Sequence, residues 1–265
     1  MTVHTQPALA AMPTLDDVRA AARRIEGLAR RTPLLESPAL NDKLGARLLF
    51  KAEVLQRTGT FKFRGAYNRI AALTETERAL GVVAFSSGNH AQGVAAAAAL
   101  FGIEAVIVMP ADAPAIKADN VRAMGARIVP YDRYHDDREK IAEPYVEKGM
   151  ALVKPFDDPL IVAGQGTVGL EIAEDAEAMG VRIDAVVTPC GGGGLMAGIA
   201  TAVKALSPQT EIWGAEPDNF DDTRRSLAAG SRVKADTAGT SICDALMSPM
   251  PGELTFAINR KLAAG

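Results

Sequence analysis

Several features that mark other protein classes are scarce in this chain of 265 residues. Its two cysteines, Cys190 and Cys243, cannot form a disulfide framework or a cysteine-rich metal site. No apolar run approaches membrane-spanning length, and the first 13 residues lack the basic start and apolar stretch of a secretory signal. The net charge of −3 provides no basic field for nucleic acid. We therefore expect a cytoplasmic protein that binds neither membranes nor nucleic acid, with a short disordered lead-in.

The residues that are abundant indicate an ordinary globular protein. Hydrophobic residues make up 48% and charged residues 23% of the chain. Only 5% are aromatic, whereas alanine and glycine are common, and this favours close packing of helices on sheets.

Apolar strands and helices alternate along the chain. A first helix is expected over 14–28, with Thr14 as its N-cap and an apolar stripe of Val18, Ala21, Ile25 and Leu28. Further helices are expected at 92–100, 113–124, 166–179 and 195–206. Strands are expected at 48–53, 82–85, 105–109, 127–129, 185–188 and 212–215. This alternation predicts an α/β fold with a parallel sheet covered by helices on both faces.

A lysine between two aromatic residues is the first candidate for chemistry. Lys62 stands between Phe61 and Phe63, after a polar turn and at the start of a helix. A lysine taken alone is usually a solvated surface charge. Here the flanking rings predict a partly desolvated amine, and desolvation favours the neutral form that attacks an aldehyde.

Two loops that each follow a strand and open a helix are the next candidates. The first is Ser86-Ser87-Gly88-Asn89-His90, whose small polar residues expose backbone N–H groups to an anion such as a carboxylate. The alternative is an ordinary N-cap. The second is Gly191-Gly192-Gly193-Gly194, which lets several N–H groups converge on one phosphate. Its alternative is a flexible linker, and it matches neither the nucleotide P-loop nor the dinucleotide fingerprint.

A lysine suited to imine chemistry, a carboxylate cradle and a phosphate cup together indicate pyridoxal 5′-phosphate (PLP) and an amino acid. In this order, the three motifs resemble the serine/threonine dehydratase and serine racemase branch of the fold type II, or β-family, PLP enzymes. The resemblance runs from about Thr32 to the end of the chain. It implies two open, twisted, mainly parallel sheets covered by helices, with the cofactor in an interdomain cleft. It also implies a large domain of residues 1–55 plus 155–265, a small domain of 56–154, and a homodimer.

The resemblance implies a role for each motif residue. Lys62 would form the Schiff base, Phe61 would lie beside the pyridine ring, and Asn89 would contact the ring oxygen. The phosphate cup would comprise the four glycines of the second loop and Leu195. The substrate carboxylate would bind Ser86, Ser87, Asn89 and His90. Ser87 matches the residue that protonates the opposite face of the substrate in racemases, so some racemisation is expected.

Two further positions refine the resemblance. Lys62 is followed by Phe-Arg-Gly-Ala rather than by the aspartate usual in cysteine and threonine synthases, which favours the dehydratase/racemase branch. Glu216, the Phe220 carbonyl and Asp222 match a divalent-cation site of racemase-like members, where oxygen ligands suit Mg²⁺, Mn²⁺ or Ca²⁺. The alternative is an acidic surface turn. Arg138 matches a position near the substrate and favours an acidic side chain, or else it is a surface residue.

The predicted activity is therefore that of a PLP-dependent ammonia-lyase. It would convert L-threonine, L-serine or 3-hydroxyaspartate to a 2-keto acid and ammonia. A serine or aspartate racemase is the alternative within the family. An inactive, truncated paralogue that acts as a binding protein is the alternative from another class. Family members continue beyond Gly265 with the residue that faces the pyridine nitrogen, so we expect the C-terminal part of the large domain to be missing.

Overall fold

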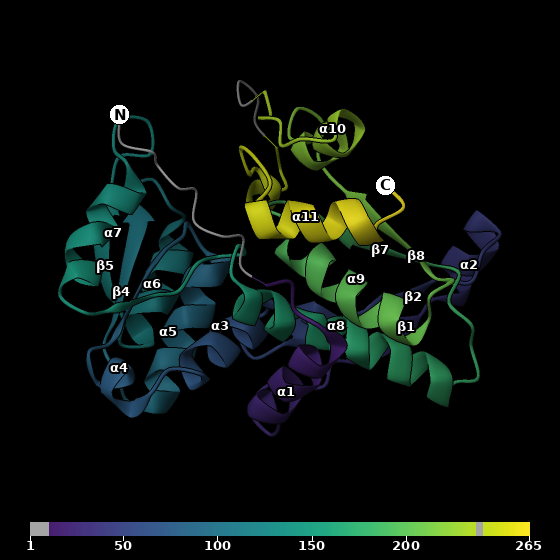
Figure 1. Ribbon diagram of the computed structural model, residues 1–265, viewed down its shortest axis with the longest axis horizontal. Helices are drawn as coiled ribbons and strands as arrows, with labels where there is room; N and C mark the ends of the chain where they lie inside the picture. The colour runs from purple at the N-terminus through teal and green to yellow at the C-terminus, as the bar shows by residue number, and fades with distance from the viewer. Residues whose placement is uncertain (1–10, 237–240) are drawn as a thin grey trace.

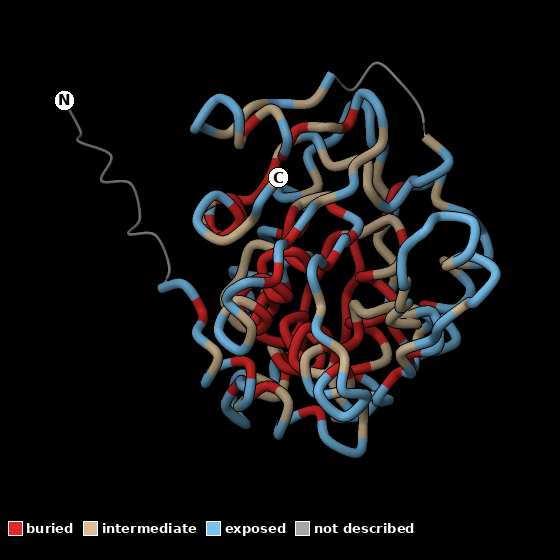
Figure 2. Tube along the Cα trace, turned by 90° about the vertical axis from the view of Figure 1, so that its right-hand side faces the viewer, coloured by how far each residue is buried: buried red, intermediate tan, exposed pale blue. Residues whose placement is uncertain are grey.

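The computed structural model describes residues 11–236 and 241–265, so most of the expected lead-in lies outside the described residues. Two regions of the chain lie side by side, each with its own parallel sheet (Figure 1). Helices α3 (Lys62–Ala71) and α8 (Pro159–Ala178) lie where the two regions meet. Buried residues gather in the interior of the molecule, as Figure 2 shows.

The first region contains a four-stranded parallel sheet in the order β5-β4-β3-β6. The bounds of its strands are β3 Val82–Phe85, β4 Ala105–Pro110, β5 Arg127–Tyr131 and β6 Ala151–Leu152. Every residue of β3 and β4 is buried, because alternate side chains pack on opposite layers of helices. One layer comprises α3, α5 (Asn89–Phe101) and α6 (Ala115–Ala123), and the other comprises α7 (Arg138–Glu147).

The second region contains the parallel pair β7 (Ala185–Pro189) and β8 (Glu211–Ala215). One face of the pair packs through Val186 and Ile212 on α9 (Gly194–Leu206). On the other face, Val187 and Trp213 are 67% and 40% exposed. Within the described residues, helices therefore cover both faces of the first sheet, as expected, but only one face of this pair. Helices α8, α10 (Asp222–Ala229) and α11 (Glu253–Leu262) complete the region.

The N-terminal segment adds α1 (Leu15–Ile25) and an antiparallel ribbon of β1 (Leu34–Glu36) and β2 (Leu49–Lys51). Thr14 and Asp17 form a capping box at α1, and Val18, Ala21 and Ile25 are buried, as the apolar stripe predicted. The short elements α2 (Pro38–Leu44), α4 (Glu75–Ala79), η1 (Glu53–Leu55) and η2 (Asp244–Leu246) complete the order.

Helix α8 begins about seven residues earlier than its pattern predicted. The Asp158 carboxylate accepts hydrogen bonds from the N–H groups of Leu160 and Ile161, and Pro159 occupies the first turn. The early turns are rich in small residues because α8 approaches α3 closely. A Cβ atom on Gly164 would lie 2.6 Å from the Cα atom of Gly65.

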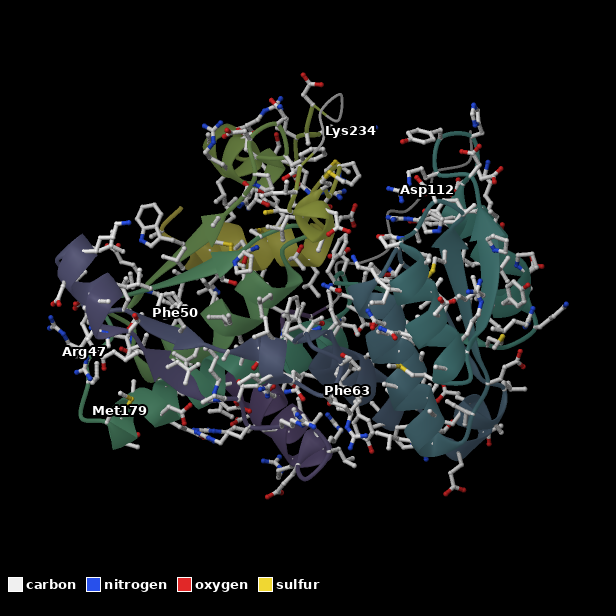
Figure 3. The ribbon with its side chains drawn as sticks, turned by 180° about the vertical axis from the view of Figure 1, so that it is seen from behind. Arg47, Phe50, Phe63, Asp112, Met179 and Lys234 are labelled. Atoms are coloured by element: carbon white, nitrogen blue, oxygen red, sulfur yellow. The ribbon has the colours of Figure 1, made fainter. Side chains whose placement is uncertain are left out.

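Arg64 joins α3 to the second region. Its guanidinium is fully buried and donates paired hydrogen bonds to the carboxylates of Glu53 and Glu171. Removing one partner of a buried pair typically costs about 3–5 kcal/mol. The adjacent Phe63 lies on α3 near the middle of the molecule (Figure 3). Because α3 packs on both regions, the division at residues 56 and 154 stays a prediction.

None of the helices in residues 11–236 and 241–265 combines the length and apolar character needed to cross a membrane.

Candidate active site

Lys62 opens α3 with its amine facing the interior. Its Nζ donates a hydrogen bond of 2.7 Å to the carbonyl oxygen of Pro155 and lies 5.3 Å from the centre of the Phe61 ring. Burial lowers the pKa of the Lys62 amine to about 8. Loss of hydration therefore makes the neutral, nucleophilic form accessible near physiological pH.

The serine-rich loop connects the end of β3 to the start of α5. The Ser86 N–H donates to the carbonyl of Val108 at the same edge of the sheet, and the Gly88 N–H donates to Ser86 Oγ. Among the residues that the structure describes, no side chain caps α5. The first N–H groups of this helix are thus free for an anionic ligand.

His90 lies within the same turn but is only 2% exposed. Its Nε2 lies 2.9 Å from the Val153 carbonyl, so Nε2 carries the proton and donates it. Burial and, next, the nearby charge of Lys62 lower the pKa of His90 to about 3. The ring is therefore neutral. His90 can hold a carboxylate through its backbone N–H but not as an imidazolium cation.

The glycine loop connects β7 to α9 and is held by α11. Gly193 has a φ of 87°, a conformation that favours glycine. A Cβ atom at this position would lie 2.9 Å from Asn259 Nδ2 and 3.1 Å from Thr255 Oγ1. The Thr255 hydroxyl donates to the Gly192 carbonyl at 2.7 Å, so this carbonyl is hydrogen-bonded to α11. The loop therefore presents backbone N–H groups at the positive end of α9.

Pro155 and Phe156 connect the lysine to the glycine loop. The Pro155 carbonyl accepts the Lys62 hydrogen bond, and the Phe156 ring lies 2.4 Å from the Cβ position of Gly192. Lys62 and the glycine loop lie far apart in the sequence, but both contact the segment formed by Pro155 and Phe156. Their proximity brings an amine and a phosphate-type loop close enough for one small ligand.

The helix of the serine-rich loop also packs against the lysine. A Cβ atom on Gly93 would lie 3.0 Å from the Lys62 carbonyl carbon, so α5 contacts the backbone of α3 at this residue. Phe61 packs against the apolar cluster that contains Leu195. Lys62 therefore contacts α5 directly and is linked to the glycine loop through Pro155 and Phe156, and the three motifs fit a cofactor with an aldehyde and a phosphate. A cavity of about 430 Å³ between α1 and α8 is lined by Arg64, but neither by Lys62 nor by either loop.

The acidic segment after β8 brings two of its predicted ligands together. The Glu216 carboxylate accepts hydrogen bonds from the N–H groups of Thr223 and Arg224. Asp222 is fully buried, and neither carboxylate oxygen has a partner within the described chain. Burial and then the Glu216 charge raise the pKa of Asp222 to about 7, and burial raises that of Glu216. Phe220 is buried beside them.

An unpartnered buried carboxylate next to a second one fits a cation, because a positive charge would remove the cost of burying both. Among the described residues, no group of three or more His, Cys, Asp or Glu side chains is arranged so that it could hold a metal ion. Any cation here would therefore need ligands beyond the two carboxylates, such as a backbone carbonyl or water.

Sequence reasoning missed the residues that support the site. Pro155, Phe156, Thr255 and Asn259 belong to no motif, and the first contributes only a backbone carbonyl. Their roles follow from the path of the chain and leave no local signal in the sequence.

The fold and the site place the chain in a known class. It belongs to the pyridoxal-phosphate dependent enzyme family, whose model matches residues 25–264. The predicted family and fold class are therefore confirmed.

Individual relatives cover nearly the whole chain. The L-threo-3-hydroxyaspartate ammonia-lyase of Saccharomyces cerevisiae is 45% identical over 251 residues, which are 94% of this chain and 76% of that protein. The serine racemase of Schizosaccharomyces pombe is 42% identical, over 93% of this chain and 75% of that one. The crystal structure of maize serine racemase is 39% identical with a TM-score of 0.90, and the match covers 96% of this chain and 75% of that one.

Proposed function

We propose that this protein is a PLP-dependent ammonia-lyase that converts L-threonine, L-serine or 3-hydroxyaspartate to a 2-keto acid and ammonia. The observation that carries the proposal is the link through Pro155 and Phe156 between the Lys62 amine and the glycine loop. The relatives include ammonia-lyases for hydroxyaspartate and for threonine, which supports this reaction.

Lys62 would hold the cofactor and act as the base. Because burial lowers the pKa of its amine to about 8, the neutral form of Lys62 is more accessible near pH 7 than that of an exposed lysine. When bound, PLP delocalises the negative charge that develops on the substrate Cα atom. Once the substrate amine has displaced it from the cofactor, the freed Lys62 amine would take the Cα proton, and the Pro155 carbonyl would orient that amine. Phe61 would lie beside the pyridine ring, and the N–H groups of Gly191–Gly194 and Leu195 would hold the phosphate.

The serine-rich loop would bind the substrate carboxylate. The free N–H groups at the start of α5 and the side chains of Ser86, Ser87 and Asn89 supply donors for it. His90 contributes through its backbone only, because its ring is buried and neutral. Asn89 would also contact the ring oxygen of the cofactor.

A racemase activity is the second candidate, and Ser87 is the residue that favours it. Ser87 is partly exposed beside the start of α5, and its hydroxyl makes no hydrogen bond within the described residues. A free hydroxyl there could protonate the substrate from the face opposite Lys62. Ser87→Ala should then lower racemisation relative to elimination, which chiral chromatography of the remaining substrate would measure.

Several finer features belong to the same proposal. The cofactor would lie between a large domain of 1–55 plus 155–265 and a small domain of 56–154. Glu216, the Phe220 carbonyl and Asp222 would bind Mg²⁺, Mn²⁺ or Ca²⁺, which the unpartnered Asp222 carboxylate supports. The protein would work as a homodimer in the cytoplasm.

A substrate panel tests the proposed reaction. The protein loaded with PLP would be given L-serine, L-threonine and 3-hydroxyaspartate, with detection of the keto acid and ammonia. Stoichiometric release of both products from at least one substrate is expected. A colourless protein that PLP cannot load, with no product from any substrate, would instead indicate an inactive binding protein.

A further inference from the structure

Lys117 of α6 lies across the serine-rich loop. A Cβ atom on Gly88 would lie 2.6 Å from the Lys117 Cδ atom and 3.1 Å from its Nζ atom. The lysine side chain thus occupies the space that the missing side chain of Gly88 leaves open. Its ammonium group lies directly beside the loop to which we assign the substrate carboxylate.

The amine of Lys117 also reaches the second region of the molecule. Its Nζ lies 2.9 Å from Asp244 Oδ2, the first residue of η2. The next two residues, Ala245 and Leu246, lie 3.4 Å from the Cβ position of Gly191 in the glycine loop. Lys117 therefore places a positive charge between the two loops, where a substrate held beside the cofactor would have its side chain.

A second cation lies behind the same loop. The Arg138 guanidinium lies 4.7 Å from the centre of the Phe85 ring, and Phe85 is the residue before Ser86. The α-carboxylate of an amino acid is matched by the N–H groups at the start of α5. The side chains of serine and threonine carry no charge, so neither substrate can form an ion pair with the Lys117 ammonium, which would keep Asp244 as its partner.

Another carboxylate can readily replace Asp244 as the partner of Lys117. The two side chains are 22% and 50% exposed, and partly exposed pairs of this kind contribute little stability. A carboxylate on the substrate side chain offers the same chemistry as the Asp244 carboxylate.

We propose that Lys117 determines substrate specificity by binding the side-chain carboxylate of 3-hydroxyaspartate in the place that Asp244 now occupies. This inference rests on the proposed ammonia-lyase function and narrows its substrate class to dicarboxylic hydroxy-amino acids. Asp244 holds the ammonium in position until substrate binds.

The test compares kcat/KM for 3-hydroxyaspartate and for L-serine in five variants of the PLP-loaded protein, namely Lys117→Met, Lys117→Arg, Asp244→Asn, Arg122→Met and Arg138→Met. Lys117→Met should lower the ratio of the two values by about 10- to 100-fold, because a charge-assisted hydrogen bond is lost for one substrate only. Lys117→Arg should restore most of the ratio. Asp244→Asn should leave the ratio unchanged or raise it. Arg122→Met, which changes an exposed residue of the same helix, should leave the ratio as it is.

A binding measurement separates this inference from the proposed function. Calorimetry with succinate should show at least about 10-fold weaker binding to Lys117→Met than to the original protein, while butyrate should bind both equally. A protein that turns over neither substrate but shows this difference would contradict the proposed reaction and still support the carboxylate site. An equal loss for both substrates, or a change of the ratio in Arg138→Met but not in Lys117→Met, would overturn the inference.

Discussion

The serine-rich loop and the glycine loop occupy equivalent places in two different sheets. Each follows a parallel strand and opens a helix of 13 residues, so each presents free N–H groups at a helix start. The serine-rich loop keeps polar side chains, whereas the glycine loop lets Phe156 pack against its backbone. We infer that the serine-rich loop suits a substrate that binds and dissociates in each turnover, and the glycine loop suits the phosphate of a cofactor that remains bound.

Of the substitutions that test this comparison, Gly193→Ala should have the largest effect, on PLP binding by the glycine loop. A side chain at a φ of 87° costs about 1–2 kcal/mol, and its Cβ atom would collide with Asn259 and Thr255. We expect PLP affinity to fall by at least roughly 100-fold, as measured by absorbance titration.

Gly180→Ala is the matched control for that change. Gly180 has a φ of 65° at the end of α8, with open space around it. It should lower stability by a similar backbone cost and leave PLP affinity unaltered. Equal loss of PLP in both variants would show that the glycine loop matters only for folding.

Ser86→Ala should distinguish the role of the serine-rich loop from that of the glycine loop. Its hydroxyl accepts the Gly88 N–H, so its loss should disturb the carboxylate cradle but not the phosphate cup. We expect the KM for substrate to rise roughly 10-fold with PLP binding retained. Ser207→Ala, at the far end of α9, should leave KM unaltered. Loss of PLP in Ser86→Ala would contradict the division of roles.

Lys62→Met should change the pH dependence of stability in the cofactor-free protein. The folded state releases the Lys62 proton near pH 8, whereas the unfolded chain keeps it to about 10.5. Stability therefore rises between these values, and below pH 8 the full burial penalty remains. Methionine should add on the order of 1–3 kcal/mol at pH 7. Urea unfolding at pH 7 and pH 10 measures this, and identical pH profiles for both proteins would refute it.

Chelation should produce the smallest effect. If Glu216 and Asp222 hold a cation, a chelator should lower the melting temperature by about a few degrees, and Mg²⁺ or Mn²⁺ should restore it. Asp222→Asn should abolish this response. If neither the chelator nor the added metal changes the melting temperature, the segment is a buried acidic turn and not a cation site.

The two regions were not equally predictable from the sequence. Strands β3 and β4 are apolar throughout and buried on both faces, so their runs predicted them almost residue by residue. The exposed face of β7 and β8 was not predicted, because Val187 and Trp213 look like core residues. Short or polar elements such as α2, α4, α10, α11, β1 and β6 were also missed.

The motif residues of the site were identifiable, but their supports were not. Lys62 and the glycines stand in unusual local patterns. Phe156 and Thr255 act only because the chain returns to the loop from distant positions. Burial alone does not identify a catalytic lysine either. The side chain of Lys51 is also buried, but its ion pairs to Glu171 and Asp175 indicate a structural role. Loss of activity in a Lys51 variant would therefore report on folding rather than on catalysis.

The central claim is that Lys62 carries the cofactor, and visible absorption tests it most directly. The protein loaded with PLP should show the absorption band of lysine-bound cofactor, and borohydride should remove the band and fix the cofactor to the peptide that contains Lys62. Lys62→Ala should lack both the band and turnover, whereas Lys43→Ala, at an exposed lysine, should keep both. A normal band and normal turnover in Lys62→Ala would contradict the account.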